Sequence, residues 1–236
     1  MDEARELATR GAPEGTVVLA DAQTAGRGRA GHTWHSPPGQ SLYLSVVLRP
    51  RIRPSQAGWI TMSAALAVID TLEDLRDTAP ATPFVAALKW FNDVLLNGRK
   101  VCGILVESSV TGDQFDYAAL GIGLNVNATF DDAPSEVRQR ATSLQREFGV
   151  AFDRERVLAS LLRRVGERQS ALSREQRSPA REYARHVETL GKDVEIETGQ
   201  GLIRGRAARV ADDGSLIIAT DQGDVAARFG DLVRQI

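Results

Sequence analysis

The sequence contains a single cysteine, Cys102, so no disulfide can form within the chain. No apolar run approaches the ~18 residues of a membrane-spanning helix. The 29 cationic and 31 anionic side chains leave a net charge of −2, without the basic field on which sequence-independent nucleic-acid binders depend. Residues 1–7 are acidic where a secretion signal would be basic and then apolar. These absences predict a cytoplasmic protein that binds neither nucleic acid nor membrane.

Lysine is also scarce, because the 29 cations comprise 26 arginines and only Lys89, Lys100 and Lys192. Lysine supplies a compact, movable point charge, whereas arginine supplies a rigid fork. Lys89 and Lys100 lie beside the most motif-like segments of the chain. Their placement favours a specific role, with chance as the alternative.

The apolar pattern predicts a sheet covered by helices. Residues 42–48 and 117–126 are apolar along strands that are buried on both faces. Asn97-Gly98 predicts a hairpin turn, since both residues tolerate positive φ. Helices are expected at residues 2–10 and 55–76, after the cap Asp153, and from Ser178-Pro179 to Gly191; further extended segments are expected at 16–20 and 84–90. The chain opens in the middle of an apparent αβ unit, so we expect a first strand upstream.

The sequence pattern changes after residue 190. Short apolar runs alternate with glycine turns at Gly199, Gly201, Gly214 and Gly223. Several strands so closely spaced predict a small barrel. We therefore expect two domains, residues 1–190 and 191–236.

A glycine-arginine loop covers residues 26–31. Its G-x-G-x-x-G pattern leads into a strand and not into a helix, which excludes a Rossmann dinucleotide site, and no P-loop pattern exists. Arg27 and Arg29 are two residues apart and could clamp phosphate or carboxylate oxygens. A solvated mobile hairpin is the plain alternative, and an arginine-glycine nucleic-acid loop is a weaker one.

Polar side chains gather at the expected strand end before the hairpin. Lys89, Asn92 and Asp93 suit an anionic ligand with a divalent ion, Asp93 serving as an oxygen donor for Mg²⁺. The alternative is an ordinary turn, because Asn and Asp favour turns. Lys100, on the far side of the hairpin, is expected to point to the same end of the sheet.

Glycines inside strands mark places where another group approaches closely. Gly103 lies in one such strand, and Gly121 and Gly123 lie in another, just before Asn125. A ligand lying across the sheet and a bulky core neighbour both remain open.

Other chemistries lack support. No G-x-S-x-G is present, and His32, His35, His186 and Cys102 show no zinc-binding spacing. The arginine-rich stretch from Arg138 to Arg185 is typical of solvated helix faces.

Five segments together resemble the biotin protein ligases in order and spacing: residues 23–34, 41–45, 89–93, 99–107 and 121–127. The resemblance spans essentially the whole chain. It implies an α+β fold, with a mixed central sheet flanked by helices as in class II aminoacyl-tRNA synthetases and biotin ligases, followed by an SH3-like barrel.

The resemblance also implies a two-step reaction. Biotin and MgATP would give biotinyl-5′-AMP, and a lysine of a biotin carboxyl carrier domain would then take the biotinyl group. It implies catalytic roles for Lys100, Arg29 and Lys89, and a metal role for Asp93. It implies ligand-binding roles for Gln23, Arg27, Gly28, Arg29, Trp34, Asn92, Lys100, Gly103, Gly123 and Asn125, with Trp34 near adenine and the glycine-arginine loop acting as a lid.

Three departures from the family pattern stand out. The family's Ser-Thr-Asn stretch would precede Asp2, so we expect either an upstream start or impaired biotin affinity. Ala30 and His32 replace arginines, which lowers the charge of the loop. Phe91 replaces the usual proline, a change we expect to be tolerated.

No winged helix-turn-helix precedes the catalytic segment, so we expect a monofunctional ligase without repressor function. A homodimer is compatible with the sequence. A lipoate or octanoate ligase or transferase is the alternative enzyme, and a non-catalytic binding protein that uses the arginine loop for nucleic acid is the alternative from another class.

Overall fold

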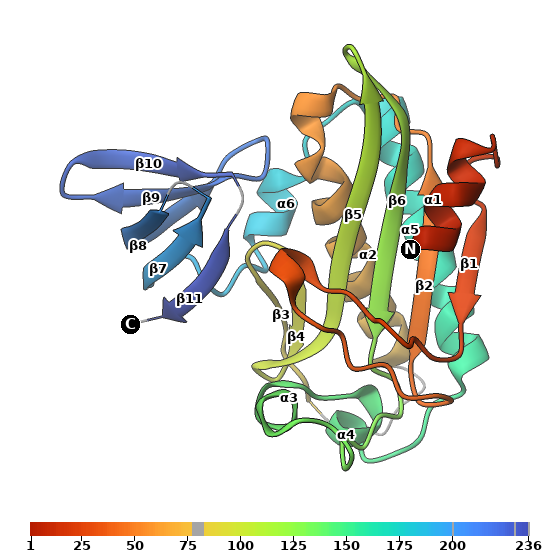
Figure 1. Cartoon of the computed structure of the whole chain (residues 1–236). Coiled ribbons are helices and arrows are strands. Elements are labelled where there is room, and N and C mark those ends of the chain that lie inside the picture. Colours follow the sequence, from red (N-terminus) through yellow and green to blue (C-terminus); the bar gives the residue numbers. More distant parts are fainter. Residues whose placement is uncertain (77–82, 200, 229, 236) are drawn as a thin grey trace.

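A six-stranded sheet forms the centre of the computed structural model, which describes residues 1–76, 83–199, 201–228 and 230–235 (Figure 1). Its strand order is β1-β2-β6-β5-β4-β3. The strands are β1 Val17–Ala20, β2 Leu42–Leu48, β3 Ala86–Lys89, β4 Asp93–Leu96, β5 Arg99–Thr111 and β6 Gln114–Leu124.

The expected α+β class is confirmed, but the expected mixed pairing is wrong. All five strand pairs of this sheet are antiparallel. Short turns join β3 to β4, β4 to β5 and β5 to β6, and a short turn reverses the chain direction, which makes these three pairs antiparallel. The β1–β2 and β2–β6 pairs join segments that are distant in the chain and are antiparallel as well. As predicted, β2 is buried along its whole length, and it lies between β1 and β6.

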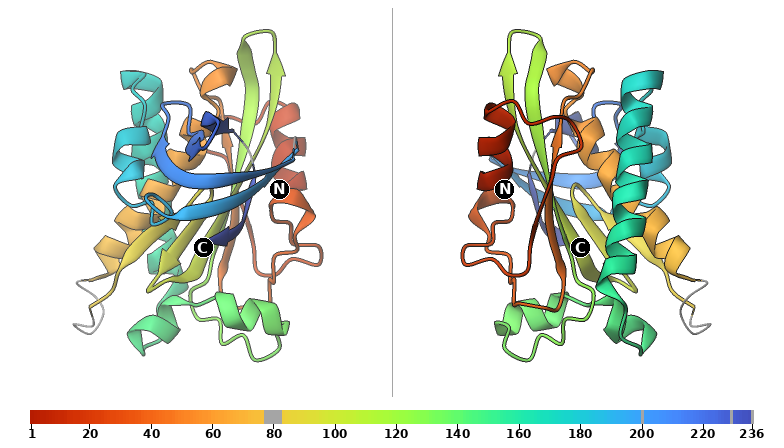
Figure 2. Two further views of the ribbon diagram at one scale, coloured as in Figure 1. Left: turned by 90° about the vertical axis from the view of Figure 1, so that its left-hand side faces the viewer. Right: turned by 90° about the vertical axis from the view of Figure 1, so that its right-hand side faces the viewer.

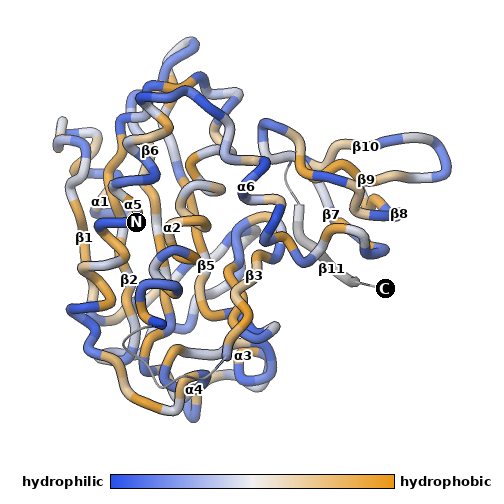
Figure 3. Tube along the Cα trace, turned by 180° about the vertical axis from the view of Figure 1, so that it is seen from behind, coloured by the Kyte–Doolittle hydropathy of each residue, from blue (hydrophilic) through white to orange (hydrophobic). Residues whose placement is uncertain are grey.

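Helices cover both faces of the sheet (Figure 2). α2 (Gly58–Arg76) and α5 (Arg154–Glu175) pack together on one face, and α1 (Asp2–Thr9) lies on the other. α2 is buried on nearly all sides because it lies between the sheet and α5. Figure 3 shows hydrophobic residues along the central strands and α2, and hydrophilic residues at the exposed hairpin tips. None of the described helices is long and apolar enough to span a membrane.

Two local predictions are confirmed, and one predicted helix is shorter than expected. Asp153 caps α5 by accepting hydrogen bonds from two backbone N–H groups, and Asn97 and Gly98 form the hairpin turn with φ of 51° and 77°. The helix expected from Ser178 to Gly191 is only α6, Ala180–Ala184. The chain beyond it pairs with β3 instead, because the Leu88 N–H donates to the His186 carbonyl at 2.8 Å. Two further short helices, α3 (Ser135–Arg140) and α4 (Leu144–Phe148), follow β6.

The C-terminal unit is a second antiparallel sheet, in the order β10-β9-β8-β7-β11. Its strands are β7 Asp193–Thr198, β8 Gly201–Val210, β9 Leu216–Thr220, β10 Gly223–Ala227 and β11 Asp231–Gln235. The turn between β8 and β9 contacts α2 and the segment after β3. Trp59 Nε1, in α2, donates to the Asp212 carbonyl at 2.6 Å, and Trp90 Nε1, just after β3, donates to the Gly214 carbonyl at 3.0 Å. The expected small β unit is present. Within the described residues, its two outer strands, β10 and β11, do not pair with each other, so the hydrogen bonds do not close a barrel.

An ion-pair network joins α2 to α5. Asp74 accepts hydrogen bonds from Arg164 and Ser160 and lies 2.6 Å from Arg163. The hydrogen bond from Arg164 lowers the pKa of Asp74 to about 2 from its ordinary value of 3.8. A depressed carboxyl pKa stabilises the fold above pH 4, and that stabilisation is lost as the pH falls from about 4 to about 2.

We therefore expect Asp74→Asn to lower the free energy of unfolding by about 1–2 kcal/mol at neutral pH, a figure reduced for partial exposure of the pair. The difference from the unchanged protein should vanish near pH 2. Urea unfolding between pH 2 and 7 measures it. Glu73→Gln is the matched control, because the ion pair that Glu73 forms within the described residues is with Arg76 on the exposed helix surface. Equal losses in both variants at all pH values would contradict the prediction.

Candidate functional site

A cleft of about 630 Å³ opens over one face of the six-stranded sheet. Its volume is within the range of small-molecule sites. Arg29 and Lys100 both line it, which is the convergence that the sequence predicts. The predicted site residues that line this one cleft are Gln23, Arg27, Gly28, Arg29, Trp34, Lys89, Asn92, Asp93, Lys100, Gly103 and Gly123.

A β-bulge aims Lys100 into the cleft. In the β4–β5 pairing, Val94 lies opposite Cys102 but Leu95 lies opposite Lys100, so Val101 is an extra residue. One extra residue shifts the alternation of side chains, and Lys100 therefore shares the face of Gly103. A Cβ atom placed on Gly103 would lie 3.3 Å from Lys100 Cε, which agrees with this placement.

Lys100 and Asp93 form an ion pair inside the cleft, with 2.6 Å between Nζ and Oδ1. The Lys100 ammonium also lies 5.2 Å from the centre of the Trp34 ring. Both side chains of the pair remain partly exposed to the cleft. A ligand phosphate can therefore reach Lys100 without unfolding its surroundings.

The two loop arginines have different partners, so they do not form one clamp as their spacing suggested. Arg27 Nη2 lies 2.6 Å from Asp2 Oδ1 at the surface. Arg29 donates to Asn92 Oδ1 at 3.4 Å and has no ion pair with a described residue. The backbone of the loop is a tight 3₁₀ turn, Arg29–Gly31, in which the His32 N–H donates to the Arg29 carbonyl. The side chain of Ala30 is outside what the structure describes.

Trp34 lies against the two strand glycines. A Cβ atom on Gly103 would come within 2.7 Å of Trp34 Cζ3, and one on Gly123 within 2.7 Å of Trp34 Cε2. The indole therefore fits only because both positions are glycine. Trp34 Nε1 is buried and has no hydrogen-bond partner in the described part of the chain.

Asn125 does not line the cleft, although from the sequence we expected it to contact the ligand. It is 4% exposed, and its side-chain amide donates to the Thr142 carbonyl at 3.0 Å. The bond fixes the segment after α3 against the end of β6. Sequence alone did not separate this role from ligand binding, because an amide after a glycine-rich strand suits both.

We expect Asn125→Ala to destabilise the fold by about 1–3 kcal/mol, since it leaves a buried carbonyl without a donor. The affinity for any small ligand of the cleft should be nearly unchanged in protein that remains folded. Chemical denaturation and ligand titration on the same sample measure the two effects. A stable variant with greatly weakened ligand binding would show that Asn125 contacts the ligand after all.

Some residues that line the cleft were not predicted from the sequence. Met1, Gln139 and Arg140 are among them, and Met1 Sδ would lie 2.7 Å from a Cβ atom on Gly121. Arg140 ends α3 in the stretch that was interpreted as solvated helix faces. It reaches the cleft because the neighbouring segment bonds to β5: the Thr142 N–H donates to the Lys100 carbonyl at 2.8 Å. No local pattern signals this long-range pairing.

Six arginine and lysine side chains are among the residues that line the cleft: Arg27, Arg29, Lys89, Arg99, Lys100 and Arg140. The single cysteine, Cys102, does not line it. Burial raises the pKa of the Cys102 thiol far above its ordinary value, so the thiol stays protonated and unreactive. Among the described residues, no group of three or more His, Cys, Asp or Glu side chains is placed to hold a metal by itself. Asp93 is the carboxylate of the predicted site.

The chain is similar to known proteins over most of its length. The Biotin/lipoate A/B protein ligase family matches residues 4–125. The chain is 36% identical over 221 residues to the Bifunctional ligase/repressor BirA of Bacillus spizizenii, which covers 93% of this chain and 66% of that protein. It is 37% identical over 224 residues to the Biotin--[acetyl-CoA-carboxylase] ligase of Mycobacterium tuberculosis, with 93% and 79% covered.

Among solved structures, the Biotin protein ligase from Aquifex aeolicus in complex with biotin and ATP superposes with a TM-score of 0.80 at 30% identity, over 99% of this chain and 94% of that one. The sheet, the cleft and these similarities together define a ligase of the biotin and lipoate type. The chain belongs to the Biotin/lipoate A/B protein ligase family, on its biotin protein ligase branch.

Proposed function

We propose that this chain ligates biotin to a specific lysine of a biotin carboxyl carrier domain, with ATP as the energy source and biotinyl-5′-AMP as the intermediate. The observation that carries the proposal is the presence of Arg29 and Lys100 in one cleft. The names of the relatives from Mycobacterium tuberculosis and Aquifex aeolicus support the choice of biotin and of a carboxylase acceptor.

The first step brings two anions together. The biotin carboxylate attacks the α-phosphorus of ATP, a new C–O–P anhydride bond forms, and pyrophosphate leaves with the electron pair of the broken P–O bond. Fixed cations offset the repulsion and stabilise the charge that develops in the transition state. Lys100, Arg29 and Lys89 line the cleft and supply three positive charges there.

Lys100 can exchange partners during this step. In the ligand-free cleft its ammonium is paired with Asp93. An α-phosphate that takes over the ammonium leaves the Asp93 carboxylate free for Mg²⁺. The fit is reasonable, because Mg²⁺ binds through one or two carboxylates together with substrate phosphates and water. The ion would supply charge neutralisation for the pyrophosphate leaving group.

Trp34 and the loop protect the intermediate. Trp34 lines the cleft, and its indole offers a flat face for adenine. Closure of residues 26–31 over the ligand excludes water, which would hydrolyse the acyl-adenylate. In the second step the neutral ε-amine of the acceptor lysine attacks the biotin carbonyl carbon, AMP leaves, and an amide bond forms.

The proposal also covers the acceptor, the compartment and the division of the chain. The acceptor is a carrier domain of acetyl-CoA carboxylase or a related carboxylase, and the compartment is the cytoplasm, where the single cysteine needs no partner. We keep the division into residues 1–190 for catalysis and 191–236 for the small β unit. The possible homodimer stays a prediction.

The test is biotin-dependent exchange of labelled pyrophosphate into ATP. We expect exchange that requires biotin and Mg²⁺ and that lipoate neither supports nor inhibits at equal concentration. Exchange driven by lipoate instead would favour the alternative, a lipoate ligase. No exchange with either acid, also after a Ser-Thr-Asn segment is restored before Asp2, would contradict the proposed function.

A further inference from the structure

Phe91 lies between the glycine-arginine loop and the C-terminal unit. The Arg29 guanidinium carbon is 5.5 Å from the centre of the Phe91 ring. The ring also contacts the β8–β9 turn, where a Cβ atom on Gly214 would lie 3.2 Å from Phe91 Cε2. Phe91 is only 7% exposed. One aromatic ring therefore touches both the loop over the cleft and a different sheet of the protein.

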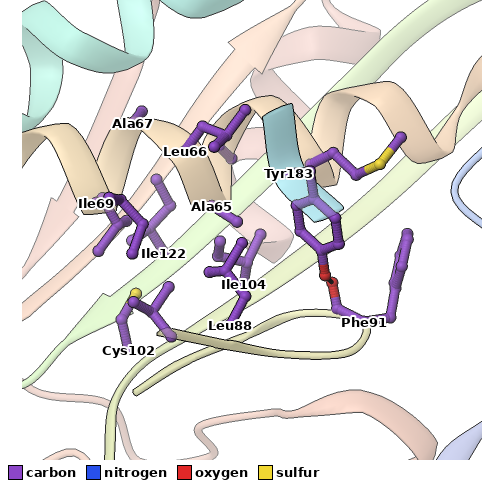
Figure 4. Close-up of a cluster of buried hydrophobic side chains, with 14 of the residues drawn as sticks. Ala65, Leu66, Ala67, Ile69, Leu88, Phe91, Cys102, Ile104, Ile122 and Tyr183 are labelled. Atoms are coloured by element: carbon purple, nitrogen blue, oxygen red, sulfur yellow. Dashed lines mark hydrogen bonds between the residues drawn. The ribbon is translucent and has the colours of Figure 1, made fainter. Parts of the chain in front are cut away.

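The backbone at Phe91 is held on two sides. The Tyr183 hydroxyl, which is fully buried in α6, donates to the Phe91 carbonyl at 2.8 Å (Figure 4). The neighbouring indole of Trp90 donates to the Gly214 carbonyl at 3.0 Å. Gly214 has φ of +92°, and glycine leaves room for the ring. The ring thus has little freedom to move.

Arg29 is held by groups that carry no charge. Within the described part of the chain, Arg29 lies against the Phe91 ring and donates to the Asn92 amide oxygen, and it forms no ion pair, whereas Arg27 is paired with a carboxylate at 2.6 Å. A carboxylate partner would cancel most of the charge that a phosphate needs. An aromatic face attracts a guanidinium without neutralising it. Arg29 is therefore fixed beside the cleft with its charge available.

We propose that Phe91 is a positioning residue: its ring holds Arg29 in place for the adenylate phosphate, and the Gly214 turn holds the ring, which couples the C-terminal unit to the loop. The role in the reaction rests on the proposed function, but the contact itself is tested without ligand. The family's usual proline at this position has no aromatic face. Phe91 is thus more than a tolerated substitution in this chain.

The first experiment is hydrogen–deuterium exchange of the ligand-free protein. The reporters are the N–H groups of Gly28, His32 and Trp34, which bond within the loop at 2.7, 2.9 and 2.9 Å. Phe91→Leu keeps an apolar side chain but removes the aromatic face, and we expect these amides to exchange about 3–10-fold faster. Phe91→Tyr should keep the slow exchange. Equal exchange in Phe91→Leu and the unchanged protein would overturn the proposal.

A second pair of variants tests the coupling to the C-terminal unit. Gly214→Ala places a methyl group against Phe91, and we expect faster exchange in the loop. Gly223→Ala is the matched control, since Gly223 also has positive φ, at +110°, and its side-chain position has no neighbour within 4 Å. If both alanine variants change the loop equally, the coupling through Phe91 is wrong.

The third readout is the rate at which biotinyl-5′-AMP leaves the enzyme. Phe91→Leu should raise it about 3–10-fold, and should have no further effect in an Arg29→Gln background, because the contact is then already lost. Fully additive effects would overturn the proposal. Phe91→Met repeats the test with a more adaptable side chain if the leucine variant is unstable. If the protein makes no adenylate, the proposed function is wrong. The hydrogen–deuterium exchange experiment then decides by itself whether Phe91 holds Arg29.

Discussion

Replacing Lys100 with methionine should lower the rate of biotin-dependent pyrophosphate exchange by about 10²–10³-fold, the usual effect of removing one preorganised charge from a transition state. Methionine keeps the length of the side chain against Gly103 and Trp34, so packing changes little. The lost ion pair with Asp93 is partly exposed and contributes at most about 1 kcal/mol to stability. We expect the melting temperature to shift by only a few degrees.

Lys192→Met is the matched control for this variant. Lys192 lies in the C-terminal part, near Glu188, and does not line the cleft. It should retain nearly full exchange activity. If Lys100→Met exchanges pyrophosphate at a rate close to that of the unchanged protein, Lys100 is not a catalytic residue and the proposed first step is wrong.

Arg29→Gln should convert the enzyme into one that leaks its intermediate. The variant loses a cation that the structure holds beside the cleft by neutral contacts. We expect the half-life of bound biotinyl-5′-AMP to fall at least about tenfold, the loss of one charge-assisted hydrogen bond, and free intermediate to accumulate in solution. Rapid separation of bound from free intermediate measures both.

Arg51→Gln removes the same charge from an exposed position that does not line the cleft, and it should retain the intermediate normally. Arg27→Gln should give a different phenotype, weaker biotin binding without faster release. The family resemblance implies a biotin contact for Arg27, and its side chain lies against Asp2 and not against Asn92 as Arg29 does. Retention by Arg29→Gln equal to that of the unchanged protein would show that the loop does not hold the adenylate.

Local signals in the sequence were sufficient for much of the fold. The Asn97-Gly98 turn, the Asp153 cap and the apolar run in β2 each depend on neighbouring residues, and all three predictions hold. The strand pairing and the length of α6 depend on contacts between distant segments. The bond between Leu88 and His186 ends α6 early, and nothing near residue 186 signals it.

The same distinction applies to the site. Residue types at strand ends and inside strands predicted that Lys100, Asp93, Gly103 and Gly123 gather at one end of the sheet, and all four line the cleft. The β-bulge that turns Lys100 to the face of Gly103 has no signal in the sequence. Asn125 was assigned to the ligand from the glycines before it and from the family resemblance. Its bond to Thr142, 17 residues away in the chain, has no local signal. The roles of Arg140 and Phe91 also depend on packing between separate elements.

The most direct measurement is the structure of the complex with biotinyl-5′-AMP. The account predicts that the bridging phosphate lies in the 630 Å³ cleft and that both Arg29 and Lys100 reach its oxygens at hydrogen-bond distance, about 2.7–3.2 Å. Lys100 should then have left Asp93. A phosphate bound outside this cleft, or one that neither cation contacts, would contradict the account.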